Sequence, residues 1–373
     1  MNSVVGRLFS LTLTALLCLS CSRGQSGLSD PQITAAASAP RPKNVILFIG
    51  DGMGFESVKA ASLYKTGQEE ALSFQSFPHK ARMTHNNARN STTDSAAAAT
   101  AIATGVRVNN TVVSVALPGD GEKLETLLER FQSEGKRTGL VTTSYIEDAT
   151  PAAFAAHQRS RGLYRQVALD MLKTRPHLLM GAYRVITPEA AREFGYQTVE
   201  TEEQLNAFDS NQDLPIAGLF GIGKLPYEFD DEDTGAPDLS EMTVKALDIL
   251  DAETDGFFLM VENENIDESG HHNHIQRHVA ATLELDEAVK EAVLWATGRT
   301  DTLILVTSDH ETGGLKVKEH LGKDHFPEVT WSTKGHTETP VPLYAVGPRS
   351  EFFRGTVNNT DVFKILTAGT QRP

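Results

Sequence analysis

The chain has 373 residues, of which 40% are hydrophobic and 22% are charged, a composition typical of soluble globular proteins. Its length is sufficient for one large α/β domain or two small domains. The formal net charge of −15 argues against a nucleic-acid-binding surface, which is normally basic. A small anionic substrate is compatible with this charge, provided that cations at the binding site reverse the local field.

The N-terminus of the sequence predicts an export signal over residues 1–20. Arg7 precedes an apolar stretch at residues 8–19 that is too short to span a bilayer. The next residues lead to Cys21, which resembles the lipid-acceptor cysteine of bacterial lipoproteins, although Cys18 stands where these proteins usually have Leu. We therefore expect an exported, periplasmic protein that is anchored to the membrane through Cys21. Because the sequence has only these two cysteines, the rest of the chain offers no disulfide framework and no cysteine-based metal site.

The remaining sequence divides into a linker and one domain. Residues 21–42 are rich in Ser, Gly, Ala and Pro and are expected to form a flexible tether. From residue 43 onwards, predicted strands and helices alternate, which indicates an α/β fold whose mostly parallel sheet is covered on both faces. No internal repeat and no linker interrupts residues 43–368, so we expect residues 43–373 to form a single domain.

Apolar periodicity and turn residues predict the elements of this domain in chain order. They are a strand at 45–50, helices at 55–65, within 90–105 and at 122–134, a strand at 138–143, a helix at 162–174, strands at 177–181 and 216–220, a helix at 240–250, a strand at 257–261, a helix at 275–296, and strands at 302–308 and 339–346. Ser240 is expected to cap its helix. Pro340 and Pro342 suggest an edge or irregular position for the last strand. The acidic stretch 229–238 is expected to be a solvated loop rather than a metal site.

Three of the apolar runs end at acidic residues. These are Asp51 after 45–50, Glu262 after 257–261, and Asp309 with His310 after 302–308. Short continuous apolar runs are typical of buried parallel strands, and sites form at the carboxyl ends of such strands. One strand-ending aspartate is usually only a turn residue or a helix cap. If the three strands are neighbours, however, their carboxylates converge and require cations, so we predict a metal site.

An alanine-rich segment at residues 90–105 places Ser95 at the start of its predicted helix. The small side chains allow this helix to lie close to the sheet. Backbone N–H groups and the macrodipole at a helix start favour an anion. A serine there is ordinarily a helix cap, and no Gly-x-Ser-x-Gly motif indicates a hydrolase triad. A nucleophilic Ser95 would need activation by a base or a metal.

Histidines in the C-terminal half add nitrogen ligands to these carboxylates. Asp267 and His271 are four residues apart and face one ion if that turn is helical. His336 lies in a Gly-flanked loop before the last strand, where a lone histidine is more often structural. The other histidines of this region are expected at the surface or behind the ligands: His272, His274 and His278. Nitrogen and carboxylate ligands without sulfur suit a catalytic zinc site.

Six segments of the chain resemble the alkaline phosphatases. They are 44–54, 93–105, 148–161, 262–271, 306–310 and 335–347, and the similarity also covers 219–230 and 239–250. The Thr-Asp-Ser-Ala segment at 93–96 together with the strand-ending Asp-Gly-Met-Gly at 51–54 is highly specific. The resemblance implies a three-layer α/β/α sandwich and the hydrolysis of small phosphate monoesters.

The resemblance also implies a role for each candidate residue. Ser95 matches the nucleophile that becomes phosphorylated, and Arg161 matches the arginine that holds the phosphate with a planar guanidinium. Two zinc ions and one magnesium ion are implied. Their ligands would be Asp267, His271 and His336 for the first zinc, Asp51, Asp309 and His310 for the second, and Asp51, Asp148, Thr150 and Glu262 for magnesium. Without the resemblance, Arg161 would be interpreted as a surface arginine of a basic loop.

The sequence departs from the family at two points. Glu268 stands where family members often carry a basic, aromatic or small residue, and its charge is expected to weaken phosphate binding or to change magnesium affinity. The family's disulfides and long insertions are absent from this sequence. The thermal stability of family members and the geometry of their dimers are therefore not expected to apply to this chain, although a homodimer is expected.

These features predict an exported, zinc-dependent phosphomonoesterase with a covalent phosphoserine intermediate. A phosphodiesterase or sulfatase on the same metal scaffold is an alternative, although such relatives typically use Thr or a modified Cys where this chain has Ser95. A catalytically inactive lipoprotein that captures phosphate or zinc is an alternative of another class, and only Glu268 supports it. The sequence leaves open whether cobalt or calcium replaces the expected metals.

Overall fold

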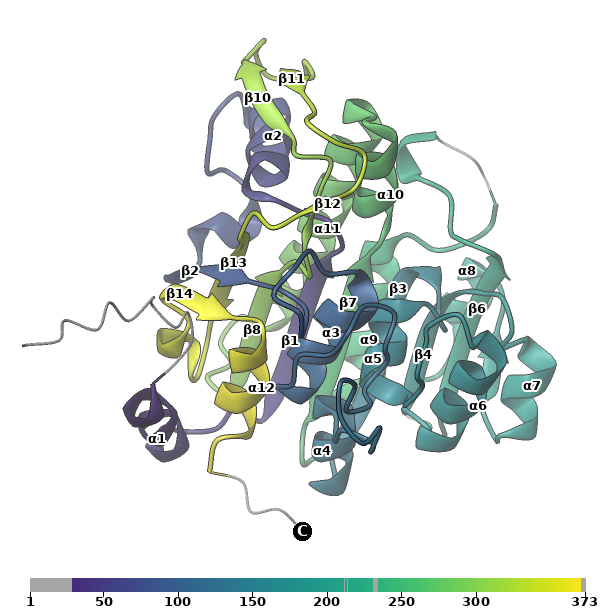
Figure 1. Ribbon diagram of the computed structural model, residues 1–373. Coiled ribbons are helices and arrows are strands. Elements are labelled where there is room, and N and C mark those ends of the chain that lie inside the picture. The colour runs from purple at the N-terminus through teal and green to yellow at the C-terminus, as the bar shows by residue number, and fades with distance from the viewer. Residues whose placement is uncertain (1–28, 211, 213, 231–233, 370–373) are drawn as a thin grey trace, which may run out of the picture.

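The computed structural model describes residues 29–210, 212, 214–230 and 234–369 (Figure 1). The predicted export signal and Cys21 lie outside these residues.

Ten strands form one sheet, in the order β14-β2-β13-β8-β1-β7-β3-β4-β6-β5. Their bounds are Gly355–Asn358 (β14), His79–Thr84 (β2), Val341–Val346 (β13), Thr302–Thr307 (β8), Asn44–Gly50 (β1), Phe257–Asn263 (β7), Arg137–Tyr145 (β3), Leu178–Tyr183 (β4), Ile216–Ile222 (β6) and Gln197–Val199 (β5). Only β13 runs antiparallel to its neighbours, so the predicted mostly parallel sheet is confirmed.

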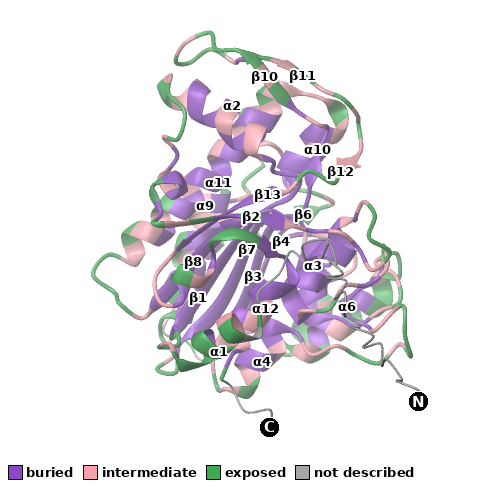
Figure 2. Cartoon of the chain, turned by 60° about the vertical axis from the view of Figure 1, so that its left-hand side comes forward, coloured by how far each residue is buried: buried purple, intermediate pink, exposed green. Residues whose placement is uncertain are grey.

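The three strands that lead to the acidic residues are neighbours at the centre of this sheet. β1 pairs in parallel with β7 on one side and with β8 on the other. Ile49 lies opposite both Glu262 and Thr307, so the three chains reach the same edge of the sheet together. All seven residues of β1 are buried, which explains its continuous apolar sequence (Figure 2).

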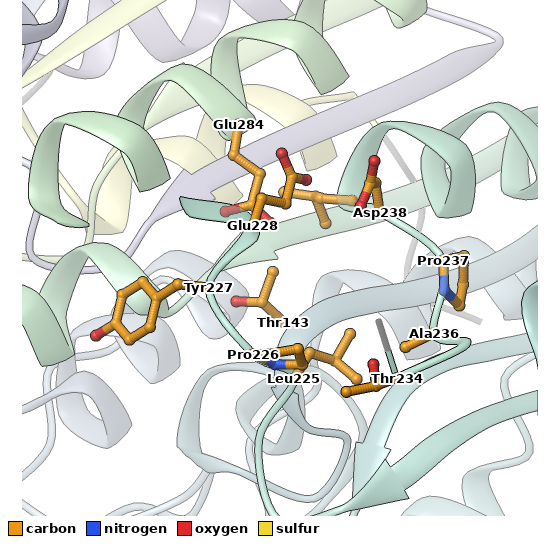
Figure 3. Close-up of a pocket in the computed structure, with 11 residues that line it drawn as sticks. Thr143, Leu225, Pro226, Tyr227, Glu228, Thr234, Ala236, Pro237, Asp238 and Glu284 are labelled. Atoms are coloured by element: carbon orange, nitrogen blue, oxygen red, sulfur yellow. The ribbon is translucent and has the colours of Figure 1, made fainter. Parts of the chain in front are cut away.

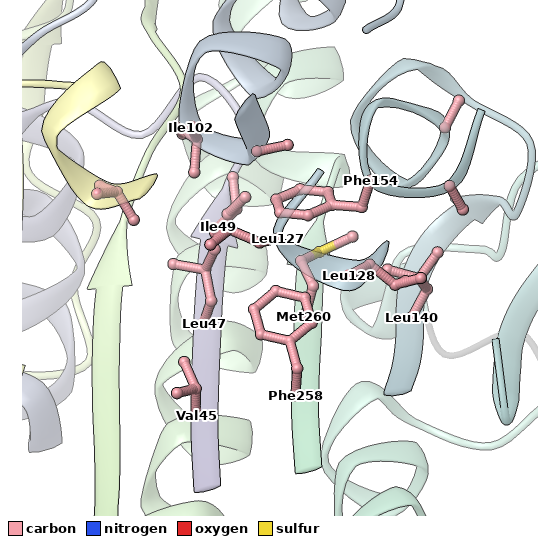
Figure 4. Close-up of a cluster of buried hydrophobic side chains, with 14 of the residues drawn as sticks. Val45, Leu47, Ile49, Ile102, Leu127, Leu128, Leu140, Phe154, Phe258 and Met260 are labelled. Carbon is pink, nitrogen blue, oxygen red and sulfur yellow. The ribbon is translucent and has the colours of Figure 1, made fainter. Parts of the chain in front are cut away.

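Helices cover both faces of the sheet and complete the three expected layers (Figure 1). One face packs against α3 (Ser95–Thr104), α4 (Leu127–Ser133), α5 (Ala149–Ala155), α6 (Tyr164–Thr174) and α12 (Thr360–Thr367). The other packs against α2 (Phe55–Thr66), α9 (Leu239–Leu250) and α11 (Ile275–Trp295). Alternate residues of β1 supply the two cores: Val45, Leu47 and Ile49 belong to the first, whereas Ile46 and Phe48 belong to the second (Figure 4).

Smaller elements surround this framework. α7 (Pro188–Glu193) and α8 (Glu202–Ala207) lie between the strands near β5, and α10 (Asn265–His272) follows β7 directly. The short pair β9 (Glu311–Thr312) and β12 (His336–Thr337) places His336 opposite Thr312, close to the end of β8. A second pair, β10 (Lys316–Glu319) and β11 (Glu328–Thr330), extends from it. Within the described part of the chain, no helix has the length and apolar character needed to cross a bilayer.

The flexible tether predicted over residues 21–42 is wrong for part of its length. Residues Asp30–Ser38 form helix α1, in which Ala36 is fully buried. Helix α1 contacts α12, and the carbonyl oxygen of Ala39 accepts a hydrogen bond from the Arg349 guanidinium. Alanine-rich sequence favours helix once a partner surface is available, and composition alone does not show that surface.

Two predicted helix starts are also wrong, because side chains cap the backbone elsewhere. The helix expected at 122–134 begins only at Leu127, since Thr126 caps it and exchanges hydrogen bonds with Glu129. The helix expected to be capped by Ser240 begins at Leu239, and Asp238 occupies the capping position. The acidic stretch around Asp238 therefore includes a structural residue as well as solvated ones.

The last strand does not lie at an edge, which was one of the two alternatives that its prolines suggested; the other was an irregular strand. β13 lies between β2 and β8. Pro342 lies opposite Arg82 in the pairing with β2, whereas the pairing with β8 covers only Tyr344–Val346 and does not include it. Proline is therefore tolerated here inside the sheet.

Candidate active site

The strand ends converge around one glycine. Asp51 follows β1, and the backbone N–H of Gly52 donates a hydrogen bond to Asp309 Oδ1 at 3.2 Å. Gly52 has a positive φ of 75°. A Cβ atom at this position would lie 2.9 Å from both Asp267 Oδ1 and Thr312 Oγ1. Glycine is thus required for α10 and β9 to approach the end of β1 closely.

Asp51, Asp309 and His310 form one compact group of ligand atoms. His310 Nε2 lies 3.5 Å from Asp51 Oδ1 and 3.2 Å from Asp309 Oδ2. All three side chains are buried. Among the described residues, neither Asp51 Oδ1 nor Asp309 Oδ2 has a hydrogen-bond partner. Buried carboxylate oxygens without a donor are costly, so this group fits a bound cation.

Asp267, His271 and His336 form a second group beside the first. His271 Nε2 lies 3.1 Å from Asp267 Oδ2, and His336 Nε2 lies 3.6 Å from Asp267 Oδ1. The rings of His310 and His336 stack at 3.6 Å, so the two groups adjoin. Asp267, His310 and His336 also place ligand atoms within 4.8 Å of one another.

His271 and His336 are partly buried, and hydrogen bonds at Nδ1 orient their Nε2 atoms toward each other. His271 Nδ1 bonds to the Lys334 carbonyl oxygen at 2.5 Å, and His336 Nδ1 bonds to the Thr93 carbonyl oxygen at 2.9 Å. A carbonyl can only accept, so each Nδ1 carries a proton, and Nε2 is the ring atom that binds a metal ion once the ring is neutral. These two Nε2 atoms lie 3.2 Å apart. Facing lone pairs at this distance need a proton or a metal ion between them.

The residues expected to hold magnesium are less tightly gathered. Glu262 Oε2 accepts a hydrogen bond from Thr142 Oγ1 at 2.6 Å. Thr150 Oγ1 is buried and makes no hydrogen bond of normal geometry within the described residues. The Asp148 carboxylate is turned elsewhere, because Oδ1 accepts from Arg161 and Oδ2 from Ser144, both at 2.8 Å. No group of three ligand atoms closes around these residues in the part of the chain that the structure describes.

The concentration of carboxylates changes their proton affinities. Burial raises the pKa of Glu262 to about 8, against a hydrogen bond from Thr142. Burial and the charge of Asp267 raise the pKa of Asp309 to about 6. The pKa of Asp51 lies well above its ordinary value because the group is buried beside Asp309. A bound cation would relieve this repulsion and keep the carboxylates ionised.

The pKa values of two histidines in the site shift in opposite directions. The hydrogen bond with Asp267 raises the pKa of His271 to about 9. Burial, helped by the nearby His336, holds the pKa of His310 well below its ordinary value. His310 is therefore neutral, which is the form that binds a metal ion.

Ser95 lies at the edge of the first ligand group. It is the first residue of α3, and its Oγ lies 3.3 Å from His310 Nε2. The helix cap is the preceding residue, Asp94, which accepts hydrogen bonds from the backbone N–H groups of Ala97 and Thr111. Ser95 is therefore not needed as the cap that such a position ordinarily suggests, and its hydroxyl is available for chemistry.

Arg161 lies near Asp94, the residue that precedes Ser95, and is held by two carboxylates. Its guanidinium lies 2.8 Å from Asp148 Oδ1 and 3.7 Å from Asp94 Oδ2. Burial lowers the pKa of Arg161, but Asp148 and Asp94 outweigh burial, so the pKa is raised and the charge is permanent. This arrangement leaves a positioned cation next to the helix start where Ser95 lies.

The charge of Glu268 is compensated, which the sequence did not indicate. Lys224 Nζ lies 2.5 Å from Glu268 Oε2 and 2.6 Å from Glu264 Oε1. Lys224 comes from the loop after β6, whereas both glutamates belong to the turn and helix after β7. The extra negative charge next to Asp267 is thus balanced by a lysine 44 residues away in the sequence.

Sequence reasoning missed several supporting residues. Thr312 donates a short hydrogen bond to Asp267 Oδ1, Thr142 supports Glu262, and Asp94 positions both α3 and Arg161. The order Thr-Asp-Ser at residues 93–95 was a signal for Asp94, because aspartate is a preferred helix cap. Threonines have no comparable signal.

The three histidines expected at the surface or behind the ligands are placed as follows: His272 is exposed, His274 caps α11 and His278 is buried.

An acidic cavity of about 370 Å³ lies near this site (Figure 3). Glu228, Asp238 and Glu284 line it together with Thr143. Glu284 Oε2 accepts a hydrogen bond from Asn263 at 2.8 Å, and Asn263 is the last residue of β7. Within the described residues, these carboxylates do not form a group with metal-ligating geometry. We therefore separate this cavity from the site at the strand ends.

The chain is similar to known proteins in sequence and in structure. The sequence model of the family described as "Alkaline phosphatase" matches residues 42–177 and 184–328. Alkaline phosphatase 4 of Bacillus subtilis is 32% identical, over 91% of this chain and 93% of that protein. The cold-active alkaline phosphatase of a Shewanella species has a similar structure, with a TM-score of 0.80 and 27% identity over 88% of this chain and all of that one. A mutant of the alkaline phosphatase of the Antarctic bacterium TAB5, solved with magnesium in its M3 site, has a TM-score of 0.78 and 28% identity over 90% of this chain and all of that one.

Proposed function

Because this chain belongs to the alkaline phosphatase family and is a phosphatase, we propose that it hydrolyses phosphate monoesters through a covalent phosphoserine at Ser95. The observation that carries the proposal is the position of Ser95 Oγ, 3.3 Å from His310 Nε2 at the edge of two adjoining ligand groups. Arg161 supplies a permanent positive charge on the same side. A phosphodiesterase or sulfatase has no comparable support, because such relatives typically use Thr or a modified Cys where this chain has Ser95.

We further propose that the site holds two zinc ions and one magnesium ion. Asp267, His271 and His336 would hold the first zinc, and Asp51, Asp309 and His310 the second. Glu262 and Thr150 would hold magnesium together with Asp51 and Asp148. The facing Nε2 atoms and the unpartnered carboxylate oxygens support metal binding at the zinc sites. Bound metal ions would neutralise phosphoryl charge and would make an oxygen nucleophile available near neutral pH.

The residues of the chain have separate tasks in the reaction. Arg161 binds two phosphoryl oxygens and orients the phosphorus toward Ser95. The serine O–H bond and the ester P–O bond break, a bond forms between Ser95 Oγ and phosphorus, and the proton leaves with the alcohol. Water then breaks the serine O–P bond, which restores the Ser95 hydroxyl and releases inorganic phosphate. Asp94 holds Arg161 in position relative to the start of α3, because its carboxylate both caps α3 and lies near the guanidinium.

The test of the nucleophile is replacement of Ser95 together with acid trapping. We expect Ser95→Ala to lose most turnover while it still binds phosphate and zinc, because the ligands and Arg161 remain. Protein quenched in acid during turnover should carry one phosphate, located on Ser95 by peptide mass spectrometry. Ser91→Ala is the matched control, since Ser91 is exposed and hydrogen-bonded to Asn87. A trapped phosphate on another residue would contradict the proposal.

Metal removal tests the ligand assignment. Chelation should inactivate the protein, and zinc with magnesium should restore activity. His336→Ala should deplete one zinc, whereas Glu262→Gln should change the magnesium requirement and retain both zinc ions, as measured by elemental analysis of the purified protein. Full activity of metal-free protein would rule out the proposed mechanism.

We also propose export to the periplasm and acylation at Cys21, with residues 1–20 removed. The apolar stretch after Arg7 supports export. Several acyl chains give stable anchoring, since each buried methylene contributes about 0.8 kcal/mol. Cys21→Ser should move the enzyme from the membrane fraction to the soluble periplasm without a change in specific activity. An unmodified N-terminus beyond residue 21, detected by mass spectrometry, would contradict the anchor.

A further inference from the structure

An arginine stacked on two tyrosines lies next to the candidate phosphate site. The Arg184 guanidinium lies 4.1 Å from the ring centroid of Tyr164 and 5.8 Å from that of Tyr145. The two rings meet edge to face at 5.9 Å. We call these three residues the Arg184 platform. Hydrogen bonds with the side chains of Tyr145 and Tyr164 use part of the guanidinium edge. A guanidinium has five N–H donors, so others remain for a ligand.

A buried glutamate holds the platform in place. Glu147 Oε1 accepts hydrogen bonds from the backbone N–H groups of Arg184 at 2.9 Å and Ile186 at 3.2 Å, and also from that of Val185. Glu147 is fully buried in the turn after β3. The backbone of Arg184 is therefore fixed to the turn that also contains Tyr145.

The same turn connects the platform to Arg161. The backbone N–H of Asp148 donates to the Tyr145 carbonyl oxygen at 2.8 Å, and the Asp148 carboxylate binds Arg161. Tyr164 follows Arg161 by three residues, so their Cα atoms are at most about 11 Å apart. Burial and the Asp148 charge raise the pKa of Tyr145, and the Arg161 charge opposes them, which places this ring within electrostatic range of both residues.

The charge of Arg184 is not balanced by a carboxylate. Arg184 is exposed, and within the described residues it forms no ion pair. By contrast, the nearby surface residue Arg192 is paired with Glu189 and Glu200. Arg184 therefore adds a positive charge near Arg161 in a chain whose net charge is −15. Its position favours an anionic ligand that extends beyond the phosphate bound by Arg161.

We propose that the Arg184 platform is a second anion-binding subsite, which receives a further phosphate or carboxylate on the alcohol side of the substrate. Preferred substrates would then be phosphate monoesters with a second anionic group. This inference rests on the proposed phosphomonoesterase function.

The test uses a series of straight-chain alkanediol bisphosphates, each compared with the monophosphate of the same diol. We expect the wild type to prefer the bisphosphate at one chain length. Arg184→Gln should lower the ratio of the two kcat/KM values at that length about tenfold, because one charge-assisted contact is lost. The preference should also shrink as salt is added. Arg192→Gln is the matched control and should leave the ratio unchanged.

A binding measurement separates this inference from the proposed function. In a Ser95→Ala background, calorimetry should show that Arg184→Gln weakens bisphosphate binding about tenfold and inorganic phosphate binding far less. An unchanged ratio at every chain length, or an equal effect of Arg192→Gln, would overturn the platform as a subsite. Failure of the wild type to hydrolyse any of the monophosphates would instead contradict the proposed function, and the binding experiment would still test the platform.

Discussion

At the scale of single residues, Lys224 controls the charge beside the candidate phosphate site. It pairs with Glu268 and with Glu264, which is buried and has one carboxylate oxygen without a partner in the described chain. Lys224→Met should therefore leave uncompensated negative charge near a dianionic substrate. We expect the inhibition constant for inorganic phosphate to rise about three- to tenfold, measured by competition with an aryl phosphate monoester.

The matched change at Glu268 should act in the opposite direction. Glu268→Gln removes one carboxylate and leaves Lys224 paired with Glu264, so phosphate should bind a few-fold more tightly. Tighter phosphate binding would slow product release, which limits turnover in many efficient enzymes. Shifts of the same sign in both variants would show that the pair acts through structure rather than through charge.

At the scale of secondary structure elements, His278 joins three helices. It lies on α11, and its ring bonds to the Ile266 carbonyl oxygen of α10 at 3.0 Å and to Ser57 Oγ of α2 at 2.8 Å. Burial lowers its pKa to about 4, against an ordinary value of 6.5. The folded protein therefore resists a proton that the unfolded chain accepts, and stability is lost as pH falls from about 6.5 toward 4.

This linkage predicts an acid-sensitive junction. His278 should contribute a loss of about 2 kcal/mol in the free energy of unfolding between about pH 7 and pH 5. The measurement is denaturant unfolding of chelator-treated protein, so that metal release does not interfere. His278→Gln lowers stability at both pH values but should reduce the pH-dependent loss. His320→Gln, at an exposed position, serves as control and should retain it. Equal pH dependence in all three proteins would contradict the assignment.

At the scale of the whole molecule, buried carboxylates couple metal binding to stability. Without metal, the folded-state pKa of about 8 for Glu262 and about 6 for Asp309 lies above the ordinary 4.5 and 3.8. The unfolded chain therefore loses these protons at lower pH than the folded chain, and the metal-free fold becomes less stable as pH rises toward 8. Metal ions need the ionised ligands and remove this penalty.

We therefore expect stabilisation by zinc and magnesium to increase with pH. At a free zinc concentration about 1,000 times Kd, one site should add about 4 kcal/mol to the free energy of unfolding. Scanning calorimetry should show a larger gain in Tm at about pH 8 than at about pH 6. Glu262→Gln should flatten the pH dependence of the metal-free protein. A gain that is larger at the lower pH would contradict the coupling.

The sequence by itself determined the features that depend on local pattern. Continuous apolar runs identified β1, β7 and β8, since strands buried on both faces need no alternation. Their acidic ends and the Thr-Asp-Ser-Ala segment indicated Asp51, Glu262, Asp309 and Ser95 as candidate site residues, a prediction that remains to be tested. The helices α2 and α11 were also predicted, with bounds within one residue of those observed.

Only the tertiary structure decided which distant residues balance each other. Lys224 and Glu268 meet because β6 and β7 end at the same edge of the sheet, although neither sequence segment indicates the other. Helix α1 forms where composition indicated a flexible tether, because it packs on α12. Arg184 contacts Tyr145 and Tyr164 because Glu147, in the turn after β3, holds its backbone beside them. The physical reason is common to these cases: compensation of charge and burial of apolar surface act between neighbours in space, whereas sequence patterns report only neighbours along the chain.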